Sequence, residues 1–113
     1  LYNGLAEKDK PYFRESREKR FGMTLEAFAG DSAAAIAAVR STLEPVRATI
    51  AEQPFICGGA PAYADYILFG AFMWTRSTSP ASLLAKDDPL YAWRERMLDL
   101  HGGMARKARG YPV

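Results

Sequence analysis

The first candidates for chemistry are Cys57 and His101, whose thiol and imidazole are the pair that cysteine nucleophiles use. They are the only members of their residue types, they lie far apart in the sequence, and no evident third group would orient them. We therefore interpret Cys57 as a small buried apolar residue at a turn and His101 as a residue that favours a helix C-terminus. The sequence predicts no catalytic residue.

Other ligand and anion motifs are equally weak. One His, one Cys and scattered carboxylates cannot supply the spaced ligands of a metal site, so we predict no metal. Gly58 and Gly59 follow no predicted strand, which favours a turn over a phosphate-binding loop. Basic residues near the C-terminal end are interleaved with Glu95 and Asp99, which favours a mixed, solvated surface over an anion site: Arg94, Arg96, Arg106, Lys107 and Arg109.

Size and charge narrow the function classes further. The chain has 113 residues and a mass of 12.5 kDa, enough for a single domain. Its net charge of +2 produces too weak a field to predict a nucleic-acid partner. The single cysteine excludes an internal disulfide and fits a reducing compartment, so we expect a cytoplasmic protein. No apolar run approaches the roughly 18 residues of a membrane span.

The composition predicts an all-α fold, a helical bundle of about five helices. The chain has 19 alanines against 12 residues of Val, Ile and Thr, a balance that favours helix, and we predict no strands. One helix is predicted over residues 11–22, and a long one from 24 or 31 to 52, which Pro45 should bend or split. The long helix is expected to bury one face, formed by residues at steps of three and four: Leu25, Ala29, Ser32, Ile36, Val39, Leu43, Val46 and Ile50.

The segment 63–76 is the most apolar in the chain and predicts a central helix that its neighbours cover on all sides. Asp65 is the exception, an ionisable residue at the third position of that helix. Its carboxylate can accept hydrogen bonds from the free backbone N–H groups at the helix start, so we assign it a structural N-capping role. A last helix is predicted from Asp88 and Pro89 to the glycines at 102–103.

The stretch from Pro54 to Tyr66, PFICGGAPAYADY, resembles the loop and central-helix start in the C-terminal all-helical domain of glutathione transferases. In that superfamily the helix opens with a capping box, usually Ser or Thr followed three residues later by Asp, after a hydrophobic staple. Asp65 matches the box, and Pro61 with Tyr66 could form the staple. Ala62 stands where the hydroxyl belongs, and this loss should cost about 0.5–2 kcal/mol.

The similarity extends over nearly the whole chain, through residues 14–22, 63–76, 88–99 and 110–113, and points to a bacterial branch that includes the lignin β-aryl etherases. It implies that residues 1–113 are the helical domain of a two-domain parent. The other domain, an N-terminal thioredoxin-like domain absent from this chain, would hold the co-substrate glutathione and the activating Ser, Tyr or Cys. Because the chain begins at Leu1 and not at Met, we expect it to be a portion of such a protein that is inactive alone.

The resemblance also implies that this domain walls the site for a small hydrophobic or aromatic substrate. Its first helix would face the interdomain cleft, which makes Tyr12, Phe13 and Arg17 the substrate-binding candidates, with Tyr111 from the tail. Ordinary packing or surface charge is the other interpretation of each. We expect self-association through the first helix, as in a homodimer, because a surface separated from its partner domain seldom stays uncovered. The alternative function is a non-catalytic helical domain for protein association, which would need no aromatic residues at a cleft.

Overall fold

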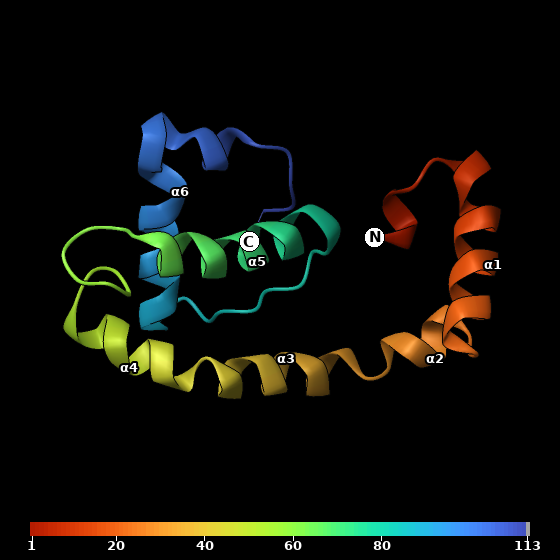
Figure 1. Cartoon of the computed structure of the whole chain (residues 1–113), viewed down its shortest axis with the longest axis horizontal. Helices are drawn as coiled ribbons and strands as arrows, with labels where there is room; N and C mark the ends of the chain where they lie inside the picture. Colours follow the sequence, from red (N-terminus) through yellow and green to blue (C-terminus); the bar gives the residue numbers. More distant parts are fainter. Residues whose placement is uncertain (113) are drawn as a thin grey trace. The chain divides into compact units, whose positions relative to one another are not determined.

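The computed structural model describes residues 1–112, and the chain divides into two compact units, Leu1–Ala38 and Val39–Val113 (Figure 1). The regular elements of the described residues are all helices, which confirms the predicted all-α fold. They are six α-helices, one more than the approximate number expected, preceded by two short 3-10 turns at Tyr2–Gly4 and Glu7–Asp9. Phe55 and Gly58 form an isolated antiparallel bridge.

The first unit is built around helix α1, Lys10–Phe21. Pro11 occupies its first turn, where a missing N–H costs nothing. Gly22 ends it in the left-handed conformation, with φ of 69°, and donates its N–H to the carbonyl of Glu18. Helix α2, Leu25–Ala29, follows, and its Thr24 cap accepts from the N–H of Ala27. The helix predicted over residues 11–22 is therefore confirmed.

The long helix predicted up to residue 52 is three helices: α2, α3 over Ser32–Thr42, and α4 over Glu44–Glu52. Pro45 lies in the first turn of α4, so the split expected there is confirmed. A second break lies at Gly30, whose φ of 60° and ψ of −153° suit glycine. The prediction that one face is buried along the whole segment was wrong, because the part of the segment within the first unit has no buried residue at all. Of the residues on that face, Leu43 and Ile50 are buried, Leu25, Ile36 and Val46 are half-buried, and Ala29, Ser32 and Val39 are exposed.

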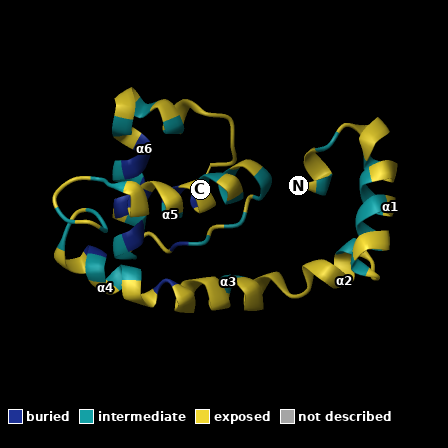
Figure 2. Ribbon diagram, viewed as in Figure 1, coloured by how far each residue is buried: buried dark blue, intermediate teal, exposed yellow. Residues whose placement is uncertain are grey.

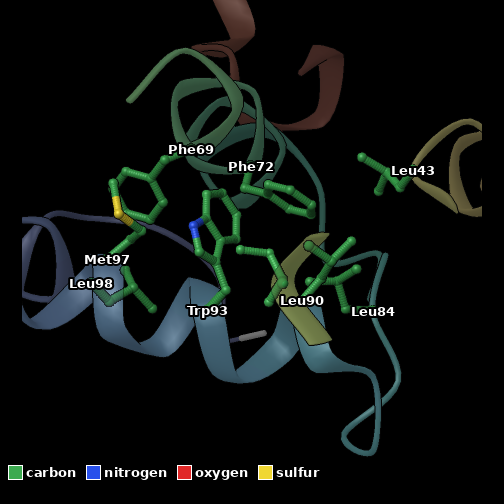
Figure 3. Packing of buried hydrophobic residues seen from close by; sticks show 9 residues of the cluster. Leu43, Phe69, Phe72, Leu84, Leu90, Trp93, Met97 and Leu98 are labelled. Atoms are coloured by element: carbon green, nitrogen blue, oxygen red, sulfur yellow. The ribbon is translucent and has the colours of Figure 1, made fainter. Parts of the chain in front are cut away.

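The second unit contains the hydrophobic core. Helix α6, Pro89–Lys107, contacts both α4 and α5, the latter spanning Tyr63–Thr78 (Figure 1). Trp93 of α6 packs edge-on against two rings of α5, Phe69 and Phe72, with centroid distances of 6.4 and 5.9 Å (Figure 3). The buried cluster comprises Leu43, Ile50, Phe69, Phe72, Leu84, Leu90, Trp93, Met97 and Leu98.

Helix α5 is not covered on all sides, which corrects the prediction for the segment 63–76. Asp65, Phe69 and Phe72 are its buried residues, whereas the opposite side is exposed (Figure 2). The exposed fraction is 80% for Tyr63, 59% for Ile67 and 64% for Trp74, and Tyr66 is also exposed. The reason is that α6 packs against the side of α5 that carries Phe69 and Phe72, and one helix on one side cannot surround another.

Candidate functional site

Two of the predicted substrate-binding residues lie together on α1. Phe13 and Arg17 are four residues apart, so they share one face of the helix, and the Arg17 guanidinium lies 4.8 Å from the Phe13 ring centroid. The ring of Tyr2 packs beside Phe13 at 6.2 Å. Arg14 stacks on Tyr2 at 4.8 Å. These residues form a group of two neighbouring rings, each with one arginine stacked on it. We call this group the α1 cluster: Tyr2, Phe13, Arg14 and Arg17.

The two arginines of the α1 cluster differ in their electrostatic partners. Arg14 binds the Glu18 carboxylate at 2.8 Å and both oxygens of Glu26 at 3.0 and 2.8 Å. The hydrogen bond from Arg14 lowers the pKa of Glu26 to about 2. Arg17 instead donates to the Ser16 hydroxyl at 3.2 Å, and among the described residues no carboxylate lies within ion-pair distance of it. The positive charge of Arg17 is thus the one that the cluster leaves available.

Tyr12 lies apart from the α1 cluster. Its side chain is 75% exposed, and it directly precedes Phe13, so the helical turn of about 100° per residue directs it to a different face. No aromatic or cation–π contact of Tyr12 occurs within residues 1–112. The structure therefore places Phe13 and Arg17 together and Tyr12 on neighbouring, open surface.

Tyr111, the fourth candidate, belongs to the second unit, where the tail is fastened to α5. Its backbone N–H donates to the carbonyl of Arg76 at 2.8 Å, and its own carbonyl accepts from Arg76 Nε at 3.3 Å. Gly110 lies against the same arginine, so closely that a Cβ there would be 2.9 Å from Arg76 Cγ and 3.1 Å from the Arg76 carbonyl oxygen. One residue of α5 thus fixes the backbone of Tyr111.

Asp65 is fully buried and lies where the loop, α5 and α6 meet. Its carboxylate accepts from the N–H of Ala62 at 3.0 Å, from the N–H of Ile56 at 2.8 Å and from the Trp93 indole N–H at 2.9 Å. Burial alone would raise the pKa of Asp65, but these N–H donors outweigh it and hold the pKa below its ordinary value. Because Ala62 has no side-chain acceptor, only the Asp65 half of a capping box exists.

Two features of the site were missed in the sequence. The pairing of Trp93 with Asp65 could have been anticipated, since a buried indole N–H needs an acceptor and Asp65 is the carboxylate in the most apolar helix. The contacts of Arg76 could not, because they join residues 29 to 35 positions apart through backbone carbonyls, which any sequence offers.

Cys57 and His101 take up separate local roles. Cys57 is exposed in the loop before α5, so the prediction that it is buried was wrong; the turn before α5 leaves its side chain on the surface. His101 adopts φ of 53°, at the point where the backbone of α6 leaves helical geometry between Leu100 and Gly103, and its Nε2 is 3.0 Å from the Tyr66 hydroxyl. Within the described residues, no three His, Cys, Asp or Glu side chains gather as metal ligands would. None of the described helices combines the length and apolarity needed to cross a membrane.

The basic residues near the C-terminal end make contacts within the fold. Arg106 pairs with Asp99 at 2.6 Å and with Glu95 at 2.9 Å, and Arg96 donates to the Pro54 carbonyl at 3.1 and 2.8 Å. Lys107 donates to the Gly102 carbonyl at 3.0 Å. These contacts fit the predicted mixed surface, but Arg94 is a correction to it, because its side chain is buried and its guanidinium stacks on the Tyr91 ring at 4.6 Å.

Comparison with known proteins gives one family. Residues 1–104 match the family model described as Glutathione S-transferase, C-terminal domain. The matched range includes α1 to α5, most of α6, the Asp65 network and the α1 cluster, and it ends before Tyr111. The chain belongs to the family of glutathione S-transferase C-terminal domains.

Proposed function

We propose that this chain is the hydrophobic-substrate half of a glutathione S-transferase-like protein. The observation that carries the proposal is the family match over residues 1–104. In the proposed protein an N-terminal thioredoxin-like domain holds glutathione and supplies the side chain that stabilises its thiolate. The helical domain contributes the surface that binds the organic substrate, and no catalytic residue is assigned to it.

The chemistry of the α1 cluster supports an aromatic substrate. Phe13 offers a ring face for stacking, and Tyr12 offers a largely exposed phenol beside it. Arg17 carries a positive charge that no carboxylate of the described residues neutralises, so it suits a carboxylate or phenolate on the substrate. Tyr111 adds a second aromatic group from the tail. Glutathione would be joined to the aromatic compound, or would displace part of it.

The finer assignment within the proposal is a β-aryl-etherase-like activity. An aryl ether offers an aromatic ring, which matches the neighbouring rings of Tyr12 and Phe13 in the first unit. In such a reaction the glutathione thiolate attacks the carbon of the ether bond, a C–S bond forms, and the phenolate leaves with the electron pair of the broken C–O bond.

The test of the substrate surface uses the protein encoded by the complete reading frame that contains this chain. Glutathione-dependent turnover of aryl ethers and aromatic electrophiles is measured for the wild type, Phe13→Ala and Arg17→Met. We expect KM to rise in both variants, and in Arg17→Met chiefly for anionic substrates. Arg20→Met is the matched control, because Arg20 is an exposed arginine on the same helix. Equal KM values in the wild type and both variants would contradict the proposed surface.

The exposed side of α5 favours a second candidate function, a helical association domain. Tyr63, Ile67 and Trp74 leave an apolar strip on a folded unit, and such strips are usually covered by another protein surface. If α5 makes such a contact, with another protein or in a homodimer, the double variant Ile67→Ser, Trp74→Ser should associate more weakly than the wild type. Sedimentation measures this association. If the wild type and the double variant both sediment as monomers, and glutathione-dependent turnover is present, the result would favour the substrate-binding function alone.

A further inference from the structure

Arg76 joins three parts of the second unit that are separate in sequence. It lies in the last turn of α5, and its guanidinium donates to the carbonyls of Ala105 at 3.0 Å and Arg106 at 3.2 Å. The Ala105 carbonyl also accepts from the backbone N–H of Ala108 at 3.3 Å, and a cation beside the carbonyls of the last turn complements the helix dipole. The third contact, from Nε, is with the Tyr111 carbonyl at 3.3 Å.

This last turn of α6 needs such an anchor because the helix is interrupted before it. Leu100 is extended, and His101, Gly102 and Gly103 all have positive φ. Across these residues the α-helical hydrogen bonds that would hold residues 104–107 to the body of α6 are broken. The last turn is instead held by side chains: Arg106 binds Asp99 and Glu95 of the body of α6, and Arg76 of α5 binds the carbonyls of the last turn and of the tail.

The tail is shaped to accept that anchor. The N–H of Tyr111 donates to the Arg76 carbonyl at 2.8 Å, so both backbone groups of Tyr111 are bound by one residue. Gly110 fits because it has no Cβ: an added Cβ would lie 2.9 Å from Arg76 Cγ and 3.1 Å from the Arg76 carbonyl oxygen. A close approach of this kind, and not a positive φ, accounts for glycine at this position.

We propose that Arg76 and Gly110 form a latch that positions the Tyr111 side chain for contact with the aromatic substrate. Arg76 is a positioning residue in this arrangement and Tyr111 is the residue that touches the ligand; this role rests on the proposed function. The latch fixes the Tyr111 backbone in advance, so the entropy of ordering the tail is not lost when a substrate binds.

The experiment measures backbone order and substrate recognition separately, in the protein encoded by the complete reading frame. Arg76→Met removes the three guanidinium bonds and keeps the aliphatic length of the side chain. Gly110→Ala keeps Arg76 but forces the two apart. Arg96→Met is the matched control, because Arg96 also donates its guanidinium to a backbone carbonyl, that of Pro54, away from the tail.

We expect amide exchange at Tyr111 to accelerate in Arg76→Met and Gly110→Ala and to stay at the wild-type rate in Arg96→Met. The KM for an aromatic substrate should rise roughly fivefold in both latch variants, with kcat nearly unchanged. Tyr111→Ala should raise KM by a similar factor. Combining it with Arg76→Met should then add little, because both changes remove the same contact. Denaturant unfolding confirms that each variant is folded.

Two results would overturn the proposal. Unchanged exchange at Tyr111 in Arg76→Met and Gly110→Ala would remove the latch itself. Faster exchange with an unchanged KM would show that the latch orders the tail without serving the substrate. A wild-type protein without any glutathione-dependent turnover would instead overturn the proposed function, and with it the role of Tyr111, while the exchange rates would still decide whether the latch exists.

Discussion

Different interactions hold the helices together within each of the two units of this chain. In the second unit, Trp93, Phe69 and Phe72 form a buried aromatic centre, and the buried Asp65 binds the indole N–H. In the first unit no residue is buried, and α1 is joined to α2 by the ion pair of Arg14 with Glu26 and by the stacked rings of Phe21 and Phe28 at 4.0 Å. Exposed ion pairs contribute little stability, whereas buried rings contribute much.

This difference indicates that the second unit is a stable scaffold and that the first unit is mostly surface. The second unit has a core on which the tail is fastened, and the first unit carries the half-buried α1 cluster, to which the proposed function assigns substrate binding. Regions with few buried contacts open most readily, so we expect amides of α1 and α2 to exchange faster than those of α6. The predictions below test this comparison.

The largest effect is expected at Trp93. Trp93→Ala removes the ring that separates Phe69 from Phe72 and leaves Asp65 without one donor, which should lower the free energy of unfolding by about 3–5 kcal/mol. Urea unfolding monitored by circular dichroism measures it. Trp74→Ala is the matched control, because that tryptophan of α5 is exposed. Similar losses for both variants would contradict the core described for the second unit.

Asp65→Asn should lower the free energy of unfolding by roughly 1–3 kcal/mol, since an amide nitrogen would face N–H donors of the buried network. Asp87→Asn, an exposed position before α6, is its control. A neutral effect of Asp65→Asn in urea unfolding would show that the three N–H groups do not depend on the carboxylate charge.

The same variant tests a pH dependence. Because the pKa of Asp65 is lower in the folded than in the unfolded chain, its stabilisation is complete above the unfolded pKa of about 3.9 and is lost as the pH falls through the lower, folded pKa. The urea midpoint of the wild type should therefore fall more steeply than that of Asp65→Asn below about pH 4. Parallel curves would contradict the lowered pKa.

Ala62→Ser should stabilise the second unit by about 1 kcal/mol, because the hydroxyl supplies the missing half of the capping box. Ala62 already has the extended backbone of an N-cap residue, with φ of −135° and ψ of −173°. Ala60→Ser, at an exposed loop position nearby, should leave the urea midpoint unchanged. A gain shared by both variants would not come from capping.

The smallest effect is expected in the first unit. Glu26→Gln removes the charge that Arg14 binds through two oxygens, but the pair is exposed and screened by salt. We expect faster amide exchange in α2 at low salt and a urea midpoint that does not move. A shift of the urea midpoint as large as that of Asp65→Asn would contradict the claim that the exposed ion pair of the first unit contributes less stability than the buried network of the second.

Local sequence patterns were sufficient for much of the fold. Pro11 and Gly22 predicted the two ends of α1, and Pro45 predicted the break before α4. Each of these residues acts through the conformation of its own backbone, which needs no distant neighbour. The spacing of Leu90, Trp93, Met97 and Leu100 puts them on one side of the last helix, and the first three are buried and Leu100 half-buried. Burial of one helix side depends on periodicity, which the sequence displays directly.

The features that escaped prediction depend on neighbours remote in sequence. The apolar pattern of α5 shows that its residues are hydrophobic but not how many helices cover it, so exposure of Tyr63 and Trp74 was unexpected. Gly30 as a break within the long segment was likewise unforeseen, because an isolated glycine is tolerated inside helices. For the candidate site, spacing placed Phe13 and Arg17 on one face, whereas the fastening of Tyr111 to Arg76 required the fold.

The most direct test of the central proposal compares glutathione-dependent turnover of aromatic electrophiles and aryl ethers by two proteins. One is this 113-residue chain, and the other is the product of the complete reading frame that contains it. We predict turnover by the complete protein, with the chain alone inactive, because the thiolate-stabilising group belongs to a thioredoxin-like domain. Turnover by the chain alone, or a complete protein that has no such domain and no activity, would contradict the assignment of this chain as the substrate-binding half.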